Sequence, residues 1–152
     1  MTTLTKEIHR FLELHTLELQ NSKISIANRY LTDYEKYIKV LNFLNSYIGT
    51  IEKYIDKAGI EAGEHSAPFV IIGSTVEVED LATQKKHTVM VEKPDTDYAT
   101  AGWDSGCEYA PFLSAASLSL LFKETGQQLT LQDGEENEYT GRIERIDYNL
   151  NL

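Results

Sequence analysis

The stretch Tyr34–Ala58, YEKYIKVLNFLNSYIGTIEKYIDKA, decides the fold of the first third of the chain. Its apolar residues recur every seven positions in two rows, which are Tyr34, Leu41, Ile48 and Ile55, and Tyr37, Leu44, Ile51 and Ala58. Two such rows make the seam by which one α-helix packs on another. The stretch has no proline, and its single glycine is Gly49. It therefore predicts a long helix that has a helical partner.

The residues before this stretch supply the partner helix. They place apolar side chains at helical spacing, at Leu4, Ile8, Phe11, Leu12, Leu19 and Ile26, with His15 and Ser22 as polar members of the same face. Between the two helices, Thr32-Asp33-Tyr34-Glu35 fits an S/T-x-x-E capping box. The second helix is therefore expected to begin at Asp33, after a reversal within Asn28–Thr32. A competing reversal at Asn21-Ser22 would leave a shorter first helix. Residues 1–58 are predicted to form an antiparallel helical hairpin, a coiled coil.

The pattern changes after residue 58. Residues 59–68 contain two glycines and a proline and are expected to be a linker. Beyond them the apolar period becomes two, which is typical of strands. Strands are predicted at Phe69–Asp80, His87–Lys93, Gln127–Gln132 and Glu138–Tyr148, a helix at Pro111–Phe122, a loop at Pro94–Ala110 and a turn at Asp133-Gly134. Residues 69–152 are thus expected to be an antiparallel sheet domain with one helix, which makes the fold α+β.

The composition limits the possible partners. The 152 residues carry a formal net charge of −10. Residues 1–58 hold eight Lys and Arg against seven Asp and Glu, whereas residues 59–152 hold six against seventeen. Such acidity argues against independent DNA binding. The sequence has no long apolar run, no export signal and one cysteine, Cys107, so a cytoplasmic protein without a membrane anchor is expected. A monomer is expected in preference to a dimer.

Several motifs of the C-terminal half resemble a known family. Val70–Val76 (VIIGSTV) resembles a V-x-x-G-[AS]-x-V opening, and Leu120–Gln127 (LLFKETGQ) resembles an L-L-G-K-x-x-G-D turn. In both respects the chain is similar to the C-terminal, FKBP-like domain of the GreA/GreB transcription elongation (transcript cleavage) factors. A helical hairpin before this domain is also that family's order of parts. The chain therefore looks like a divergent Gre factor.

The resemblance implies a function in transcription elongation. It implies RNA polymerase binding, with the hairpin in the secondary channel and the C-terminal domain docked near the rim of that channel. An apolar patch formed by Leu118, Leu121 and Phe122 is the expected anchor of this domain. Any RNA cleavage would then be carried out by the polymerase active site, so the chain itself would not be an enzyme. The hairpin tip would comprise Tyr30, Asp33 and Glu35. No intrinsic cofactor is implied, although the two carboxylates could share a polymerase-bound Mg²⁺.

The departures from the family pattern concern the chemistry of the tip. Aligning Asp33-Tyr34 with the end of the family's acidic tip motif puts Ala27 and Tyr30 where its two key acids belong. Phe122 also stands where the family has Gly, and Ala115 where it has Pro. This alignment predicts a factor that modulates or blocks the channel rather than one that strongly stimulates cleavage.

Other interpretations of the same residues stay open. Helix capping alone accounts for Asp33 and Glu35, and core packing accounts for Leu118, Leu121 and Phe122 as well as docking does. No metal-binding or nucleophile motif occurs in the sequence. A function of another class is a coiled-coil adaptor whose FKBP-like domain binds a protein other than polymerase.

Overall fold

The computed structural model describes residues 3–57, 59–61, 67–94, 108–132 and 137–148. The chain divides into two compact units, residues 1–66 and 67–152. Their boundary falls within residues 59–68, the stretch expected to be a linker. The predicted turn at Asp133-Gly134, Cys107 and most of the loop before residue 108 lie outside the described residues.

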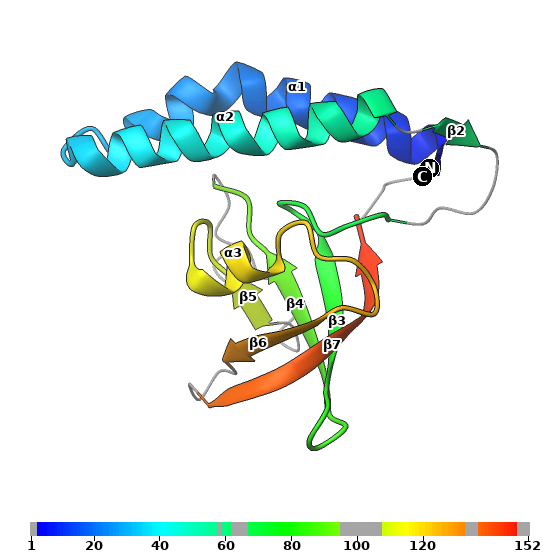
Figure 1. Cartoon of the computed structure of the whole chain (residues 1–152). Coiled ribbons are helices and arrows are strands. Elements are labelled where there is room, and N and C mark those ends of the chain that lie inside the picture. Colours follow the sequence, from blue (N-terminus) through cyan, green and yellow to red (C-terminus); the bar gives the residue numbers. More distant parts are fainter. Residues whose placement is uncertain (1–2, 58, 62–66, 95–107, 133–136, 149–152) are drawn as a thin grey trace. The chain divides into compact units, whose positions relative to one another are not determined.

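The first unit is the predicted helical hairpin. Helix α1 (Lys6–Asn28) packs along α2 (Tyr34–Lys57), drawn in blue to cyan in Figure 1. Helix α1 continues through Asn21 and Ser22, so the competing reversal is not used. Strands β1 (Thr3–Thr5) and β2 (Gly59–Glu61) pair in parallel beside the helices. Residues 59–61 of the expected linker thus form strand β2, whose backbone pairs with a segment more than fifty residues earlier.

The seam between the helices differs in one row from its prediction. On α1, the buried face contains the expected Ile8, Leu12, His15, Leu19 and Ile26. On α2, the buried residues are Val40, Leu44, Tyr47, Ile48 and Ile51. Tyr34, which the sequence placed in the seam, is 73% exposed. The reason is that α1 ends at Asn28, so no residue of α1 lies opposite Tyr34 at the start of α2.

A buried hydrogen bond crosses the seam. The Nε2 atom of His15 lies 2.7 Å from the Tyr47 hydroxyl, and the two rings meet edge to face. Both side chains are buried. A buried imidazole needs a polar partner because unmet hydrogen-bonding groups are costly in an apolar interior. Tyr47 supplies that partner from the opposite helix.

Replacing Tyr47 with phenylalanine removes the hydroxyl and keeps the ring. We expect Tyr47→Phe to lower the free energy of unfolding by about 1 kcal/mol, since a neutral buried hydrogen bond is lost. Urea denaturation followed by circular dichroism measures the change. The matched control is Tyr34→Phe, which removes an exposed hydroxyl and should change stability by less than about 0.5 kcal/mol. Equal stabilities of the two variants would contradict the prediction.

The second unit is a curled, mixed five-stranded sheet, within the described residues, with strand order β5-β4-β3-β7-β6 (Figure 1). Its elements are β3 (Thr75–Asp80), β4 (Lys86–Val91), β5 (Glu108–Ala110), helix α3 (Ala115–Leu120), β6 (Gln128–Gln132) and β7 (Glu138–Asp147). The predicted antiparallel pairing is confirmed for β3 with β4, β3 with β7 and β6 with β7. It is wrong for β5, which runs parallel to β4 within a stretch predicted to be loop.

The central strand is shorter than its prediction. Of Phe69–Asp80, only β3 is strand, although residues 69–72 are buried. The segment turns instead at Gly73, whose φ of 92° lies in the left-handed region that glycine adopts without a Cβ penalty. The Ser74 hydroxyl closes this turn by donating to the Ile71 carbonyl at 2.6 Å. The family-like V-x-x-G-S-x-V motif thus forms a turn leading into β3.

A second glycine allows the sheet to close tightly. A Cβ atom at Gly141 of β7 would lie 2.3 Å from a methyl carbon of Val78 on β3. A larger residue would require the Val78 side chain or one of the two strands to move, because real carbon contacts stay well beyond that distance. The position therefore requires glycine for packing and not for its backbone angle.

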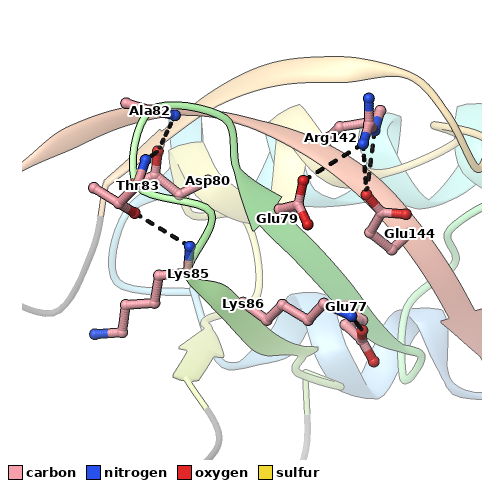
Figure 2. A network of polar contacts seen from close by, with 9 residues as sticks. All are labelled: Glu77, Glu79, Asp80, Ala82, Thr83, Lys85, Lys86, Arg142 and Glu144. Atoms are coloured by element: carbon pink, nitrogen blue, oxygen red, sulfur yellow. Dashed lines mark hydrogen bonds and ion pairs between the residues drawn. The ribbon is translucent and has the colours of Figure 1, made fainter.

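The connection between β3 and β4 is held by Asp80 (Figure 2). Its Oδ1 accepts hydrogen bonds from the backbone N–H groups of Ala82 at 2.9 Å and Thr83 at 3.4 Å. The bond from Ala82 is the main cause that lowers the pKa of Asp80 from its usual value of 3.8, because it favours the ionised carboxylate. Nearby, Arg142 of β7 contacts Glu79 at 3.4 Å and Glu144 at 3.1 Å.

Because the pKa of Asp80 is lowered in the folded chain, the free energy of unfolding is expected to decrease at low pH. A group whose pKa is lower when folded stabilises above its unfolded pKa, and that contribution is lost as the pH falls through the folded pKa. Asp80→Asn imitates the protonated form. We expect the wild-type chain to be more stable than Asp80→Asn at pH 6, with the difference shrinking below about pH 4.

Thermal denaturation of both proteins at pH values from about 2.5 to about 6, at intervals of about half a pH unit, measures this difference in stability. Glu138→Gln, at an exposed position, is the control for the loss of one negative charge. A wild-type advantage over Asp80→Asn that persists unchanged at the lowest pH would contradict the prediction.

No helix in the described ranges is long and apolar enough to span a membrane.

Candidate functional site

The hairpin tip consists of residues 29–33 and the first turn of α2. Its backbone is tightly hydrogen-bonded. The N–H of Tyr30 donates to the Ala27 carbonyl at 2.9 Å, and the N–H of Asp33 donates to the Tyr30 carbonyl at 2.9 Å. These bonds satisfy groups that would otherwise be open at the ends of two helices. The tip is therefore a defined surface, and it holds all three residues that the sequence assigned to it.

The helix cap at the tip is Asp33. Its Oδ1 accepts the N–H of Lys36 at 3.2 Å, and α2 begins one residue later, at Tyr34. The sequence had assigned this role to Thr32 and had begun the helix at Asp33, one residue too early. Aspartate and threonine both cap helices well, so the local sequence alone does not choose between adjacent candidates. The carboxylate of Asp33 is thus engaged in the fold.

The two acids of the tip have different surroundings. Asp33 accepts a backbone hydrogen bond, whereas Glu35 is exposed in the first turn of α2. At 3.6 residues per turn, positions two apart point roughly 200° apart around a helix. Among the described residues, no group of three His, Cys, Asp or Glu side chains lies close enough together to hold a metal.

What the tip does present is an apolar and aromatic surface. Leu31 is 63% exposed and Tyr34 is 73% exposed. The Tyr34 ring stacks on that of Tyr37, with centroids 6.4 Å apart. The Lys36 ammonium lies 4.9 Å from the centre of the Tyr30 ring, within the range of a cation–π contact. Sequence reasoning found Tyr30 but missed Leu31, and it assigned Tyr34 to the seam.

The residues predicted for docking are divided between surface and core. Leu118 on α3 is 50% exposed, whereas Leu121 is buried. Phe122 packs against Phe69, with ring centroids 5.5 Å apart. Phe122 itself is partly exposed, so Leu118 and Phe122 remain accessible for docking, whereas Leu121 does not. Helical spacing alone could not separate them, because α3 ends at Leu120 and the next two side chains leave the helical pattern.

Phe122 occupies a conformation that favours glycine. Its φ is 66°, and this is the position where the resembled family carries Gly. An aromatic residue in the left-handed region costs on the order of 1–3 kcal/mol. The N–H of Phe122 donates to the Val70 carbonyl at 2.8 Å, and the Lys123 carbonyl accepts from the Val70 N–H at 2.9 Å. These two bonds and the contact with Phe69 hold the strained residue in place.

The sheet unit also has a small pocket beside α3, with a volume of about 200 Å³. It is lined by Val89, Glu108, Tyr109, Ala116, Leu131, Gln132 and Tyr139. The Glu108 carboxylate lies 2.7 Å from Nδ1 of His87, and the His87 ring stacks on Tyr139 with centroids 4.5 Å apart. The pocket is thus mainly apolar, with one carboxylate held in position by a buried histidine.

The fold of this chain is similar to that of several solved structures. No protein-family model and no curated protein matches the chain. The chain is similar to the solved structure of GreA factor homolog 1 (Gfh1) of Thermus thermophilus, with 21% identity, 95% of this chain and 97% of that chain covered, and a TM-score of 0.43. It is likewise similar to transcription elongation factor GreA/GreB from Nitrosomonas europaea, with 16% identity, 97% and 100% covered, and a TM-score of 0.46. It is also similar to Gfh1 of Thermus aquaticus, with 19% identity, 96% of this chain and 97% of that chain covered, and a TM-score of 0.42.

The capping role of Asp33 is testable by substitution. We expect Asp33→Ala to lower the free energy of unfolding by about 1 kcal/mol, because the Lys36 N–H loses its acceptor at the start of α2. Chemical denaturation of the whole chain measures the loss. Thr32→Ala is the matched control and should leave stability unchanged within about 0.5 kcal/mol. A larger loss of unfolding free energy for Thr32→Ala than for Asp33→Ala would show that Thr32 is the helix cap.

Proposed function

We propose that this chain is an RNA polymerase-binding elongation factor of the Gre type, which places its helical hairpin in the secondary channel. In this proposal it modulates or blocks the channel and does not strongly stimulate transcript cleavage. The chain contributes no catalytic group of its own, since any hydrolysis of RNA belongs to the polymerase active site. Docking falls to the sheet unit, with Leu118 as its exposed apolar contact.

The order of parts supports the polymerase assignment. A helical hairpin is followed by a sheet unit that contains two family-like motifs. Both motifs have structural roles here, because Val70–Val76 makes the turn into β3, and Leu120–Gln127 connects α3 to β6. Val70 and Lys123 join the two motifs by a backbone hydrogen bond of 2.9 Å. The resemblance therefore rests on segments that meet in the fold.

The observation that carries the proposed mechanism is the chemistry of the tip. Asp33 caps α2, Glu35 stands alone on another side of the helix, and the exposed surface is formed by Leu31 and Tyr34. An Mg²⁺ ion takes several converging oxygen ligands, so most of them would have to come from the polymerase. An apolar and aromatic tip is instead suited to contact protein or nucleobase surfaces inside a channel. Obstruction of the channel follows from such contacts without hydrolysis.

A transcript-cleavage assay tests the mechanism. Backtracked elongation complexes of bacterial core RNA polymerase are mixed with the chain, and short 3′ RNA fragments are measured over time. We expect no acceleration of release, and we expect the chain to compete with a cleavage-stimulating factor. The double variant Leu31→Ser/Tyr34→Ser should weaken that competition by about tenfold, because it removes the exposed contacts of the tip.

The control for this assay is Ile24→Ser, since Ile24 is 54% exposed on α1 but lies outside the tip. It should compete like the wild-type chain. Rapid fragment release that Asp33→Ala abolishes would overturn the proposed mechanism while leaving polymerase binding intact. Failure of the chain to bind core polymerase in a pull-down would overturn the polymerase assignment itself.

The pocket beside α3 favours a second candidate function. Its apolar lining and the positioned carboxylate of Glu108 could receive a short segment of another protein, which is the behaviour of an adaptor. A pull-down with core polymerase together with analytical ultracentrifugation separates the two functions. A stable dimer that ignores polymerase would favour the adaptor.

A further inference from the structure

The hairpin carries a groove that neither the seam nor the tip uses. It lies between α1 and α2, has a volume of about 440 Å³, and is lined by Glu13, Leu14, Thr16, Leu17, Gln20, Glu52, Ile55 and Asp56. All these residues belong to the first unit, so the groove is a property of the hairpin itself. Its volume is in the range of sites that accept large side chains.

The apolar residues of the groove lie open. Leu14 is 53% exposed and Leu17 is 56% exposed, while Ile55 of α2 is half-buried beside them. Leu14 and Leu17 are three positions apart, so they lie on one face, roughly 4.5 Å apart along the axis of α1. Contiguous exposed apolar residues with a polar rim are typical of interaction surfaces. The spacing matches apolar side chains that another helix presents at positions i and i+3 or i+4.

The rim of the groove is acidic. Its charged residues are Glu13, Glu52 and Asp56, and no cation of the described residues lines it. Glu13 contacts His9 at 2.6 Å, whereas Glu52 and Asp56 make no ion pair within the part of the chain that the structure describes. Two unpaired carboxylates beside an apolar floor favour an occupant that brings positive charge to the same place.

Charge also argues against a second copy of this chain as the occupant. A second copy packed groove to groove would oppose the same carboxylates to one another, which is unfavourable for an apolar contact of this size. The occupant is therefore expected to be a different, basic protein.

We propose that this groove binds a cationic amphipathic helix of another protein. Two apolar side chains of that helix enter between Leu14, Leu17 and Ile55, and its flanking Lys or Arg residues pair with Glu52 and Asp56. The bound helix would pack on both helices of the hairpin as a third member. This surface is separate from the tip, so the proposal does not depend on polymerase binding.

Fluorescence anisotropy with two labelled helical peptides of about 18 residues tests the proposal on the full-length chain. Both peptides carry Leu at i, i+3 and i+7, one with Lys at the flanking positions and the other with Glu. We expect the Lys peptide to bind at least about tenfold more tightly. Leu17→Ser should weaken its binding by about tenfold. Glu52→Gln/Asp56→Asn should weaken it at low salt and reduce its salt dependence.

Ile24→Ser is again the matched control, because Ile24 has the same exposure as Leu14 but does not line the groove. It should bind the Lys peptide like the wild-type chain, and circular dichroism checks that all variants keep their helices. Equal affinity for the two peptides, or binding that Leu17→Ser leaves unchanged, would overturn the proposal. So would a concentration-dependent dimer in sedimentation experiments that Leu17→Ser abolishes, since the occupant would then be a second copy.

Discussion

The alignment of the two long helices is the constraint on which the rest of the hairpin depends. Apolar heptads pack almost equally well when one helix slides along the other by a whole repeat, so the seam by itself leaves the alignment open. The short connection between Asn28 and Tyr34 and the pairing of β1 with β2 restrict this sliding. The buried hydrogen bond between His15 and Tyr47, 2.7 Å long, further favours the observed alignment, in which Leu31 and Tyr34 lie exposed at the tip.

Much of the fold follows from the sequence because its signals are local and periodic. Two long helices, the reversal near residue 30, and strands around β3, β4, β6 and β7 are all indicated by apolar spacing and turn residues. Strands β2 and β5 are different. Each has three residues and pairs in parallel with a distant segment, so its partner and not its own composition makes it a strand.

The candidate site was predictable in position but less so in chemistry. The sequence placed Tyr30, Asp33 and Glu35 at the turn, where they lie. It could not assign the cap to Asp33 in place of Thr32, because both residue types cap helices well and only the structure shows the Lys36 N–H donating to Asp33. Docking residues were harder still, since Leu121 turns inward just after α3 stops. Burial in such short elements is decided by tertiary contacts, which a single sequence does not display.

The parallel pairing of β1 with β2 has a mechanical consequence. The hairpin is closed by a turn at one end, and at its other end the backbone before α1 is hydrogen-bonded to the backbone after α2. A load that enters along the chain through Glu61 is therefore shared between both helices instead of acting on α2 alone. Three consecutive residue pairs carry that load together. Compression or tension applied to the hairpin therefore acts on both helices together. Sliding one helix along the other would require breaking the β1–β2 hydrogen bonds as well as the packing between the helices.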